Sequence, residues 1–171
     1  LVRSRGLGDV YKRQGLMLVV IGGAELFTGN NLIIVPCCTG VASVRGLLKN
    51  WVVVYIANLV GSVLLAYIVF NGALYSMGGY ALGTRALAIA NAKVNLPFIE
   101  ALARGIGCNW LVCLAVWLAT SSHDTIGKIF SCFFPIMAFV AMGFEHSVAN
   151  MYFIPMGIFL KDVRPVVAKT G

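Results

Sequence analysis

Apolar residues fall in four long blocks along the chain, separated by shorter polar stretches. The blocks cover residues 15–36, 51–70, 98–120 and 126–160. Each is long enough to cross a membrane, because about 20 residues of α-helix span the hydrocarbon core. The pattern therefore predicts an all-α fold, a polytopic transmembrane helical bundle. The predicted connections are residues 37–50, 71–97 and 121–125, with a short amphipathic helix lying on the surface around 83–92.

The composition supports a location in the cell membrane, as a multi-pass protein. Of the 171 residues 60% are hydrophobic and only 11% are charged, and the mean hydropathy is +0.89. A soluble domain carries about 25% charged residues, so this chain has too few for a surface that faces water. The net charge of +7 does not gather into a basic stripe with interleaved aromatic residues, which excludes a nucleic-acid partner.

Residues 1–14, LVRSRGLGDVYKRQ, differ from the rest of the chain. They are polar, hold four of the thirteen basic residues and do not begin with Met. A signal peptide would also be basic here, but no small-residue cleavage site follows the apolar block. We interpret residues 1–14 as a non-native leader and residues 15–171 as the domain proper. Without the leader nine basic and five acidic residues remain, a net charge of +4.

The fourth apolar block is too long for one membrane-spanning helix. As an unbroken helix its 35 residues would measure about 52 Å, against a hydrocarbon core of about 30 Å. The polar segment GFEHSVAN, residues 143–150, lies near its middle and is the predicted break. Irregular backbone at membrane depth is tolerated only when it is buried in protein or lines a wet cavity. Residues 145–150 are therefore predicted to face the protein interior.

The first apolar block has a similar interruption, GGAELFTGNN, at residues 22–31. Within the two interruptions, ELFTGN (25–30) and EHSVAN (145–150) both read Glu, four residues, Asn. Paired broken helices in corresponding halves of a chain are typical of transporters built as inverted repeats, with the binding site near the midplane. We therefore predict an inverted repeat with two broken helices.

Four segments together resemble the formate/nitrite transporter family: GAELFT, KNWVVVYIANLVGS, FIEALARGIGCNWLVCLAVWLA and AFVAMGFEHSVANMYFIPMGI. They are spread over most of the range 15–160. The resemblance implies six transmembrane helices per protomer, an aquaporin-like inverted repeat and a homopentamer with one pore in each protomer. This chain would supply the second to fifth helices, so we interpret it as a fragment. The resemblance also implies that the loop after the second helix is cytoplasmic, although Lys and Arg counts weakly favour the opposite orientation.

The resemblance assigns roles to individual residues. The central pore histidine corresponds to His146, and the threonine that faces it corresponds to Thr28. The lysine that draws anions into the vestibule corresponds to Lys93, and Asn109 and Asn150 match pore-region asparagines. The hydrophobic constrictions correspond to Leu16, Leu26, Phe27, Val112 and Phe139.

Several of these residues have a structural interpretation as well. His146 could pack between helices, Thr28 could cap the helix that follows it, and Lys93 could be an ordinary solvated lysine. Asn109 could bridge helices, and each constriction residue could belong to the core. For Glu25 and Glu145 we favour a structural role, in which they accept hydrogen bonds from backbone N–H groups freed by the breaks.

The predicted function is a channel or transporter for a small monovalent anion, most simply formate, in which His146 protonates the anion inside a hydrophobic pore. The partners are this anion, protons, the lipid bilayer and further copies of the chain; no enzymatic activity, metal or other cofactor is implied. Nitrite and hydrosulfide remain alternatives within the family. An aquaporin-like channel would show Asn-Pro-Ala motifs, and the sequence has none. A membrane redox subunit would need paired histidines for haem or clustered cysteines, and neither is present. The five cysteines form no C-x-x-C and His123 and His146 lie far apart. A structural scaffold is not excluded by the sequence.

Overall fold

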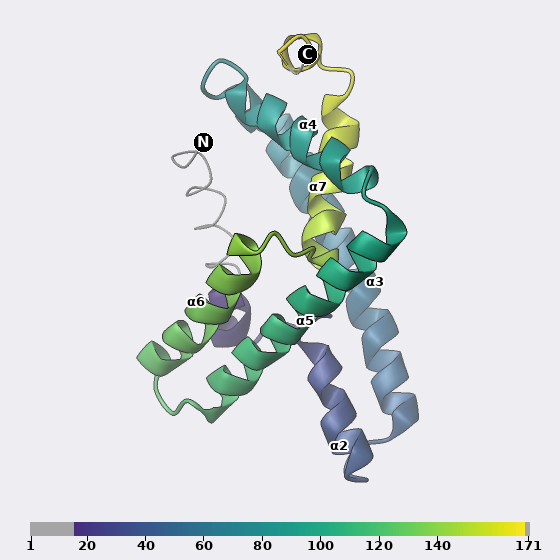
Figure 1. Ribbon diagram of the computed structural model, residues 1–171, viewed down its shortest axis with the longest axis vertical. Helices are drawn as coiled ribbons and strands as arrows, with labels where there is room; N and C mark the ends of the chain where they lie inside the picture. Colours follow the sequence, from purple (N-terminus) through teal and green to yellow (C-terminus); the bar gives the residue numbers. More distant parts are fainter. Residues whose placement is uncertain (1–15, 170–171) are drawn as a thin grey trace. The chain divides into compact units, whose positions relative to one another are not determined.

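The computed structural model describes residues 16–169, and the interpretation of residues 1–14 as a leader lies outside that range. The ordered elements of the described residues are helices (Figure 1). After a helical stretch at residues 16–22 they are η1 Asn30–Ile33, α2 Ile34–Cys38, α3 Val44–Asn71, η2 Leu74–Ser76, α4 Ala81–Val94, α5 Phe98–Ser121, α6 Thr125–Ala141, α7 Ser147–Leu160 and α8 Arg164–Val167.

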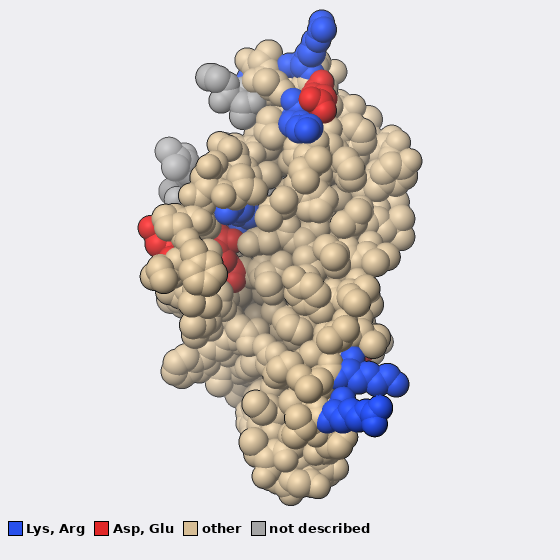
Figure 2. Space-filling model, turned by 90° about the vertical axis from the view of Figure 1, so that its right-hand side faces the viewer, with Lys and Arg blue, Asp and Glu red and all other residues tan. Residues whose placement is uncertain are grey.

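Among the described residues, two helices have the length and composition to cross a membrane by themselves. They are α3, with 28 residues, and α5, with 24. Helices α6 and α7 are apolar but shorter. The all-helical prediction is therefore confirmed. On the face drawn in Figure 2, wide stretches of surface between small groups of charged side chains carry no charge, as expected where lipid or other apolar surface covers a protein.

Helix α3 begins earlier than its apolar block indicates. The sequence pattern predicts a connection over residues 37–50, but the helix starts at Val44. The reason is local: the hydroxyl of Ser43 accepts a hydrogen bond from the backbone N–H of Gly46 at 3.1 Å, as an N-cap side chain does. Leu47, one turn into the added segment, is buried. Polar residues in this turn therefore lie on a helix end and not in a loop.

Both predicted interruptions are present. The first helical stretch ends at residue 22 and η1 begins at Asn30, whereas α6 ends at Ala141 and α7 begins at Ser147. The second break is thus shorter than GFEHSVAN, because its last four residues already belong to α7.

The helices before the two breaks end in the same way. Gly23 and Gly143 both have φ = +69°, the left-handed conformation that glycine adopts without a steric penalty. The next N–H then bonds back by five residues, from Ala24 to Val19 O at 2.9 Å and from Phe144 to Phe139 O at 3.0 Å. This is the hydrogen bond of a Schellman C-cap. In each half the left-handed glycine lies two residues before a glutamate.

The chain forms two compact units. The first comprises the residues up to 55 together with 102–146, and the second comprises 56–101 together with the residues from 147 onward. The first unit is organised around an apolar cluster contributed by the first helical stretch, α5 and α6. Its buried members are Leu16, Cys108, Val112, Ala115, Ala119, Cys132, Ile136 and Phe139. Figure 1 shows α6 beside the C-terminal half of α5.

In the second unit α4 packs against α7 (Figure 1). The predicted helix around 83–92 is therefore real but longer, Ala81–Val94, and it does not simply lie on the surface: Gly83 and Ala90 are buried in the described structure. The close approach depends on glycine, because a Cβ added to Gly157 of α7 would lie 2.3 Å from the Cβ of Ala90.

Replacing Gly157 with alanine should therefore destabilise the second unit. Overpacking of this kind costs about 1–3 kcal/mol, and thermal unfolding of the detergent-solubilised protein would measure it as a lowered midpoint. Gly61→Ala is the matched control, because a Cβ at Gly61 in α3 meets nothing within 4 Å. An equal midpoint for the two variants would contradict the packing described for α4 and α7.

Candidate functional site

His146 and Thr28 form a hydrogen bond in the first unit. The Oγ1 of Thr28 lies 3.1 Å from the Nε2 of His146, although the residues are 118 positions apart in the sequence. Thr28 is only 4% exposed, and His146 is half-buried as the last residue before α7. Each residue comes from one of the two interruptions, so the breaks bring their polar side chains together. A hydroxyl and an imidazole can exchange donor and acceptor roles.

The N-cap interpretation of Thr28 is wrong. The residue before η1 is Gly29, and no side chain caps that helix. The hydroxyl of Thr28 instead contacts His146, and its backbone carbonyl accepts a hydrogen bond from the Cys113 thiol, S to O 3.6 Å. Both polar groups of Thr28 are therefore directed toward side chains of other elements.

The apolar side chains that the resemblance assigns to constrictions lie in the same unit as this pair. The ring of Phe139 stacks on that of His146, with centroids 6.0 Å apart and an interplanar angle of 21°. Leu16, Val112 and Phe139 are buried members of the apolar cluster of the first unit, and Leu26 packs against it. Phe27 lies edge-on to Tyr55 of α3 at 5.1 Å between centroids. Four of the five predicted constriction residues thus belong to one cluster.

Asn109 and Cys113 of α5 extend the polar network behind Thr28. The Nδ2 of Asn109 lies 3.7 Å from the Sγ of Cys113, which in turn contacts the Thr28 carbonyl. Sequence reasoning treats all the cysteines as small apolar residues, and the sequence carries no signal that separates Cys113 from the others. Cys113 contacts the Thr28 carbonyl because it lies on the face of α5 that meets the first break.

Asn30, at the end of the first break, holds several neighbours in place. Its Nδ2 donates to the Glu25 carboxylate and to Asn50 Oδ1 at 2.9 Å, and its carbonyl accepts from Trp51 Nε1 at 3.1 Å. The structural role expected for Glu25 involves backbone N–H groups, and here a side-chain amide bonds the carboxylate. Sequence reasoning missed Asn50 and Trp51, because it placed both at the edge of a connection.

The second break is supported by α5. The N–H of Glu145 donates to the carbonyl of Arg104 at 3.4 Å, which gives one of the freed backbone groups a partner on another helix. The ring of Phe144 lies over Gly107, where an added Cβ would approach its Cε2 to 2.7 Å. Gly107 therefore allows the break to lie close against α5.

Gly107→Ala should displace Phe144 and, with it, the segment that carries His146. We expect transport activity to fall about three- to tenfold, since overpacking of a tight contact costs about 1–3 kcal/mol. Gly105→Ala is the control, because a Cβ at this position on the same helix meets nothing within 4 Å. Flux through purified protein in liposomes measures both; equal flux would show that the Phe144 contact does not set the position of the break.

Lys93 and Asn150 belong to the second unit, unlike the residues described above. The Nζ of Lys93 is 5.7 Å from the ring centroid of Phe153 in α7, a cation–π distance. Asn150 is half-buried in α7, three residues before Phe153, so the two share a helix face. Lys93 therefore is not a freely solvated lysine; it lies against the helix that follows the second break.

The side chains offer no metal centre within residues 16–169: no group of three or more His, Cys, Asp or Glu gathers there. The polar pair lies instead among apolar side chains, at two interruptions of otherwise apolar helices. Such an arrangement is typical of membrane transport proteins built from broken helices.

The chain belongs to the formate/nitrite transporter family. The model of that family, formate/nitrite transporter, matches residues 9–169. The chain is 52% identical over 164 residues to a protein of Methanothermobacter thermautotrophicus named Probable formate transporter, covering 87% of this chain and 60% of that one. It is 42% identical over 156 residues to the formate channel FocA of Escherichia coli K12, covering 91% and 55%.

The similarity extends to solved structures. A structure named "Pentameric formate channel with formate bound" superimposes with a TM-score of 0.88 at 41% identity, over 98% of this chain and 66% of that one. The relatives are named as channels or transporters and not as enzymes. The chain spans only about 55–60% of the length of these curated relatives.

Proposed function

We propose that the protein containing this chain is a membrane channel for small monovalent anions, and that formate is its substrate. The observation that carries the proposal is the Thr28–His146 hydrogen bond between two helix breaks in a chain of this family. The names of the relatives support formate over nitrite and hydrosulfide. The similarity to a pentameric channel with formate bound supports a homopentamer that binds formate.

We further propose that the two breaks are related as an inverted repeat. The support is local and independent of the overall arrangement. Gly23 and Gly143 have the same φ, the following residues make equivalent back-bonds, and a glutamate follows in each half. In such repeats the interrupted helices line the substrate site.

The mechanism follows from the cost of moving charge through apolar surroundings. A bare anion in a narrow apolar ring costs at least several kcal/mol. Formic acid has a pKa of about 4, so on the order of one molecule in a thousand is neutral at pH 7. A group that protonates the anion at the constriction removes this barrier without waiting for the rare neutral form.

His146 is the residue proposed to supply the proton. An imidazole titrates near pH 6.5, so it holds and releases a proton under physiological conditions. The stacked Phe139 ring and the neighbouring apolar cluster keep water away from it. The anion would then cross the constriction as neutral formic acid and release the proton to water on the far side, and His146 would take up a new proton from water on the side of entry before the next cycle.

Thr28 is proposed to serve both protonation states of His146. When Nε2 carries a proton, the Thr28 hydroxyl accepts the hydrogen bond; after the proton has left, the same hydroxyl can donate to Nε2. Its own position is fixed by the contact of its carbonyl with Cys113. The helix α7 begins directly after His146, and the positive end of its dipole would stabilise the incoming anion. Lys93 is proposed to attract anions at its own end of the path, and Asn109 and Asn150 to line the pore.

The test is a flux assay on the complete gene product in liposomes, with formate, nitrite and hydrosulfide compared over a pH series. We expect formate to cross fastest, and to cross faster as the pH falls from about 8 to about 6, because the proposed passage of the neutral acid consumes one proton on the side of entry. Faster flux of nitrite or hydrosulfide would identify that anion, and not formate, as the substrate. Passage of neutral solutes without any of the anions would favour an aquaporin-like channel.

A further inference from the structure

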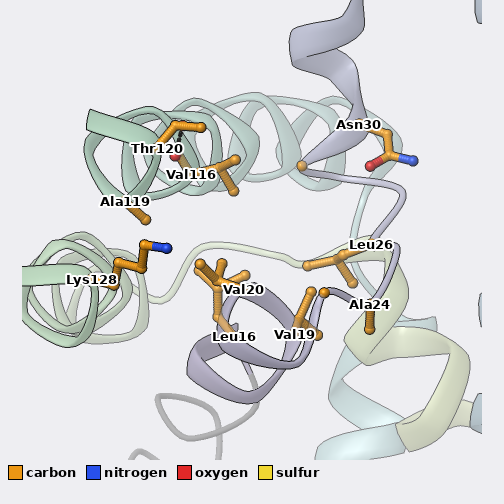
Figure 3. A pocket seen from close by; sticks show the side chains of 12 residues that line it. Leu16, Val19, Val20, Ala24, Leu26, Asn30, Val116, Ala119, Thr120 and Lys128 are labelled. Carbon is orange, nitrogen blue, oxygen red and sulfur yellow. Dashed lines mark hydrogen bonds between the residues drawn. The ribbon is translucent and has the colours of Figure 1, made fainter. Parts of the chain in front are cut away.

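A cavity of about 290 Å³ lies in the first unit, next to the proposed constriction. Its walls come from the first helical stretch, the first break, α5 and the first turn of α6 (Figure 3). They include Leu16 and Leu26, two of the proposed constriction residues, and Gly29, which directly follows Thr28. The cavity therefore borders the constriction on one side of the apolar cluster.

One cationic side chain lines this cavity. Figure 3 shows the Lys128 side chain extending from α6 toward the space between Ala119 and Val20, with its nitrogen at the tip. The other lining side chains are apolar except for Asn30 and Thr120. The hydroxyl of Thr120 bonds to the Val116 carbonyl of its own helix, and the amide of Asn30 bonds to Glu25 and Asn50.

Lys128 is not placed where its charge would stabilise helix α6. A cation in the first turn of a helix faces the positive end of the helix dipole, which is unfavourable. Within residues 16–169 no carboxylate lies within ion-pair distance of its amine. Asp124, on the preceding turn, uses Oδ1 to cap the N–H of Gly127 at 2.8 Å. An ammonium that is placed against a helix N-terminus beside an apolar cavity is instead suited to hold an anion.

We propose that this cavity is an anion vestibule and that Lys128 concentrates small carboxylates in it. Helix order places Lys128 with Arg45 and Lys49 at one end of the predicted membrane crossings. The inference rests on the proposed function, since it needs an anion to cross. It adds a cationic side chain of the first unit to the proposed path.

The test measures formate flux in both directions in right-side-out and inside-out vesicles that contain the complete gene product. Lys128→Gln should raise the half-saturating formate concentration about three- to tenfold for flux that starts on its own side, the effect of one nearby charge at intermediate screening. Flux in the other direction should keep its half-saturation within about twofold. The difference should shrink in about 1 M salt, where the Debye length falls to about 3 Å.

Two variants separate this role from a structural one. Lys128→Arg keeps the charge and should retain the wild-type half-saturation within about twofold. Lys49→Gln removes the same charge at the same predicted membrane face, from an exposed position on α3 outside the cavity, and should have little effect. Identical behaviour of Lys128→Gln and Lys49→Gln, or loss of flux without any change in half-saturation, would overturn the inference.

The outcomes also separate the two proposals. If the wild-type protein carries formate and only the Lys128 prediction fails, the vestibule is wrong and the proposed function stands. If the wild-type protein carries nitrite or hydrosulfide instead, the same comparison is made with that anion, and the vestibule is judged by it. A protein that passes no anion overturns both proposals.

Discussion

Formate flux through liposomes should fall by about a hundredfold or more when His146 is replaced with asparagine. Asparagine retains a hydrogen-bond donor toward Thr28 but cannot transfer a proton, and a positioned general acid contributes about 10²–10⁴-fold. The pH dependence of the residual flux should also change, because the proposed proton donor is gone.

His123→Asn is the matched control for this prediction. It removes the other histidine of the chain, which is exposed between α5 and α6, and it should leave both the rate and the pH profile unchanged. Size-exclusion chromatography of each variant checks that assembly is intact. Unchanged flux with an unchanged pH profile in His146→Asn would rule out protonation by this residue.

Replacing Thr28 with valine should give the second largest effect. Valine has nearly the same shape but leaves His146 Nε2 without the hydroxyl partner that lies at 3.1 Å. A hydrogen bond of this kind contributes about 0.5–1.5 kcal/mol net, and an unsatisfied buried partner costs about 1–3 kcal/mol. We expect flux to fall about ten- to hundredfold and the midpoint of the pH profile to move.

Thr28→Ser supplies the control, because it keeps the hydroxyl and loses only a methyl group. It should retain flux within about threefold and keep the wild-type pH midpoint. If Thr28→Ser loses activity and Thr28→Val retains it, the methyl packing of this 4% exposed residue matters and the hydroxyl does not. The proposed exchange of donor and acceptor roles would then be wrong.

Much of the fold could be predicted because hydropathy marks the helices of a membrane chain. The excess length of the fourth block and the polar residues inside it were enough to predict a break at residues 143–150, and the structure has the break at residues 142–146. The start of α3 was missed because the turn after Val44 is polar on the outside, and its cap, Ser43, is a common residue in loops as well.

Only part of the candidate site could be predicted from the sequence. Glu25, Thr28, Glu145 and His146 stand out because polar residues are rare inside apolar blocks. Cys113 does not stand out, since a thiol in an apolar helix is usually packing, and only the tertiary structure places it at the Thr28 carbonyl. The same holds for Lys128, which resembles any lysine near a helix end until the cavity beside it is seen.

The central claim is that the substrate crosses the constriction as a neutral acid, and the proton count per formate tests it most directly. Formate uptake into liposomes would be followed together with luminal pH, reported by a trapped dye, and with membrane current in a planar bilayer of the same protein. The account predicts acidification of the lumen by about one proton per formate and almost no current carried by formate. Formate uptake that produces current and leaves the luminal pH unchanged would contradict it, because the anion would then cross with its charge.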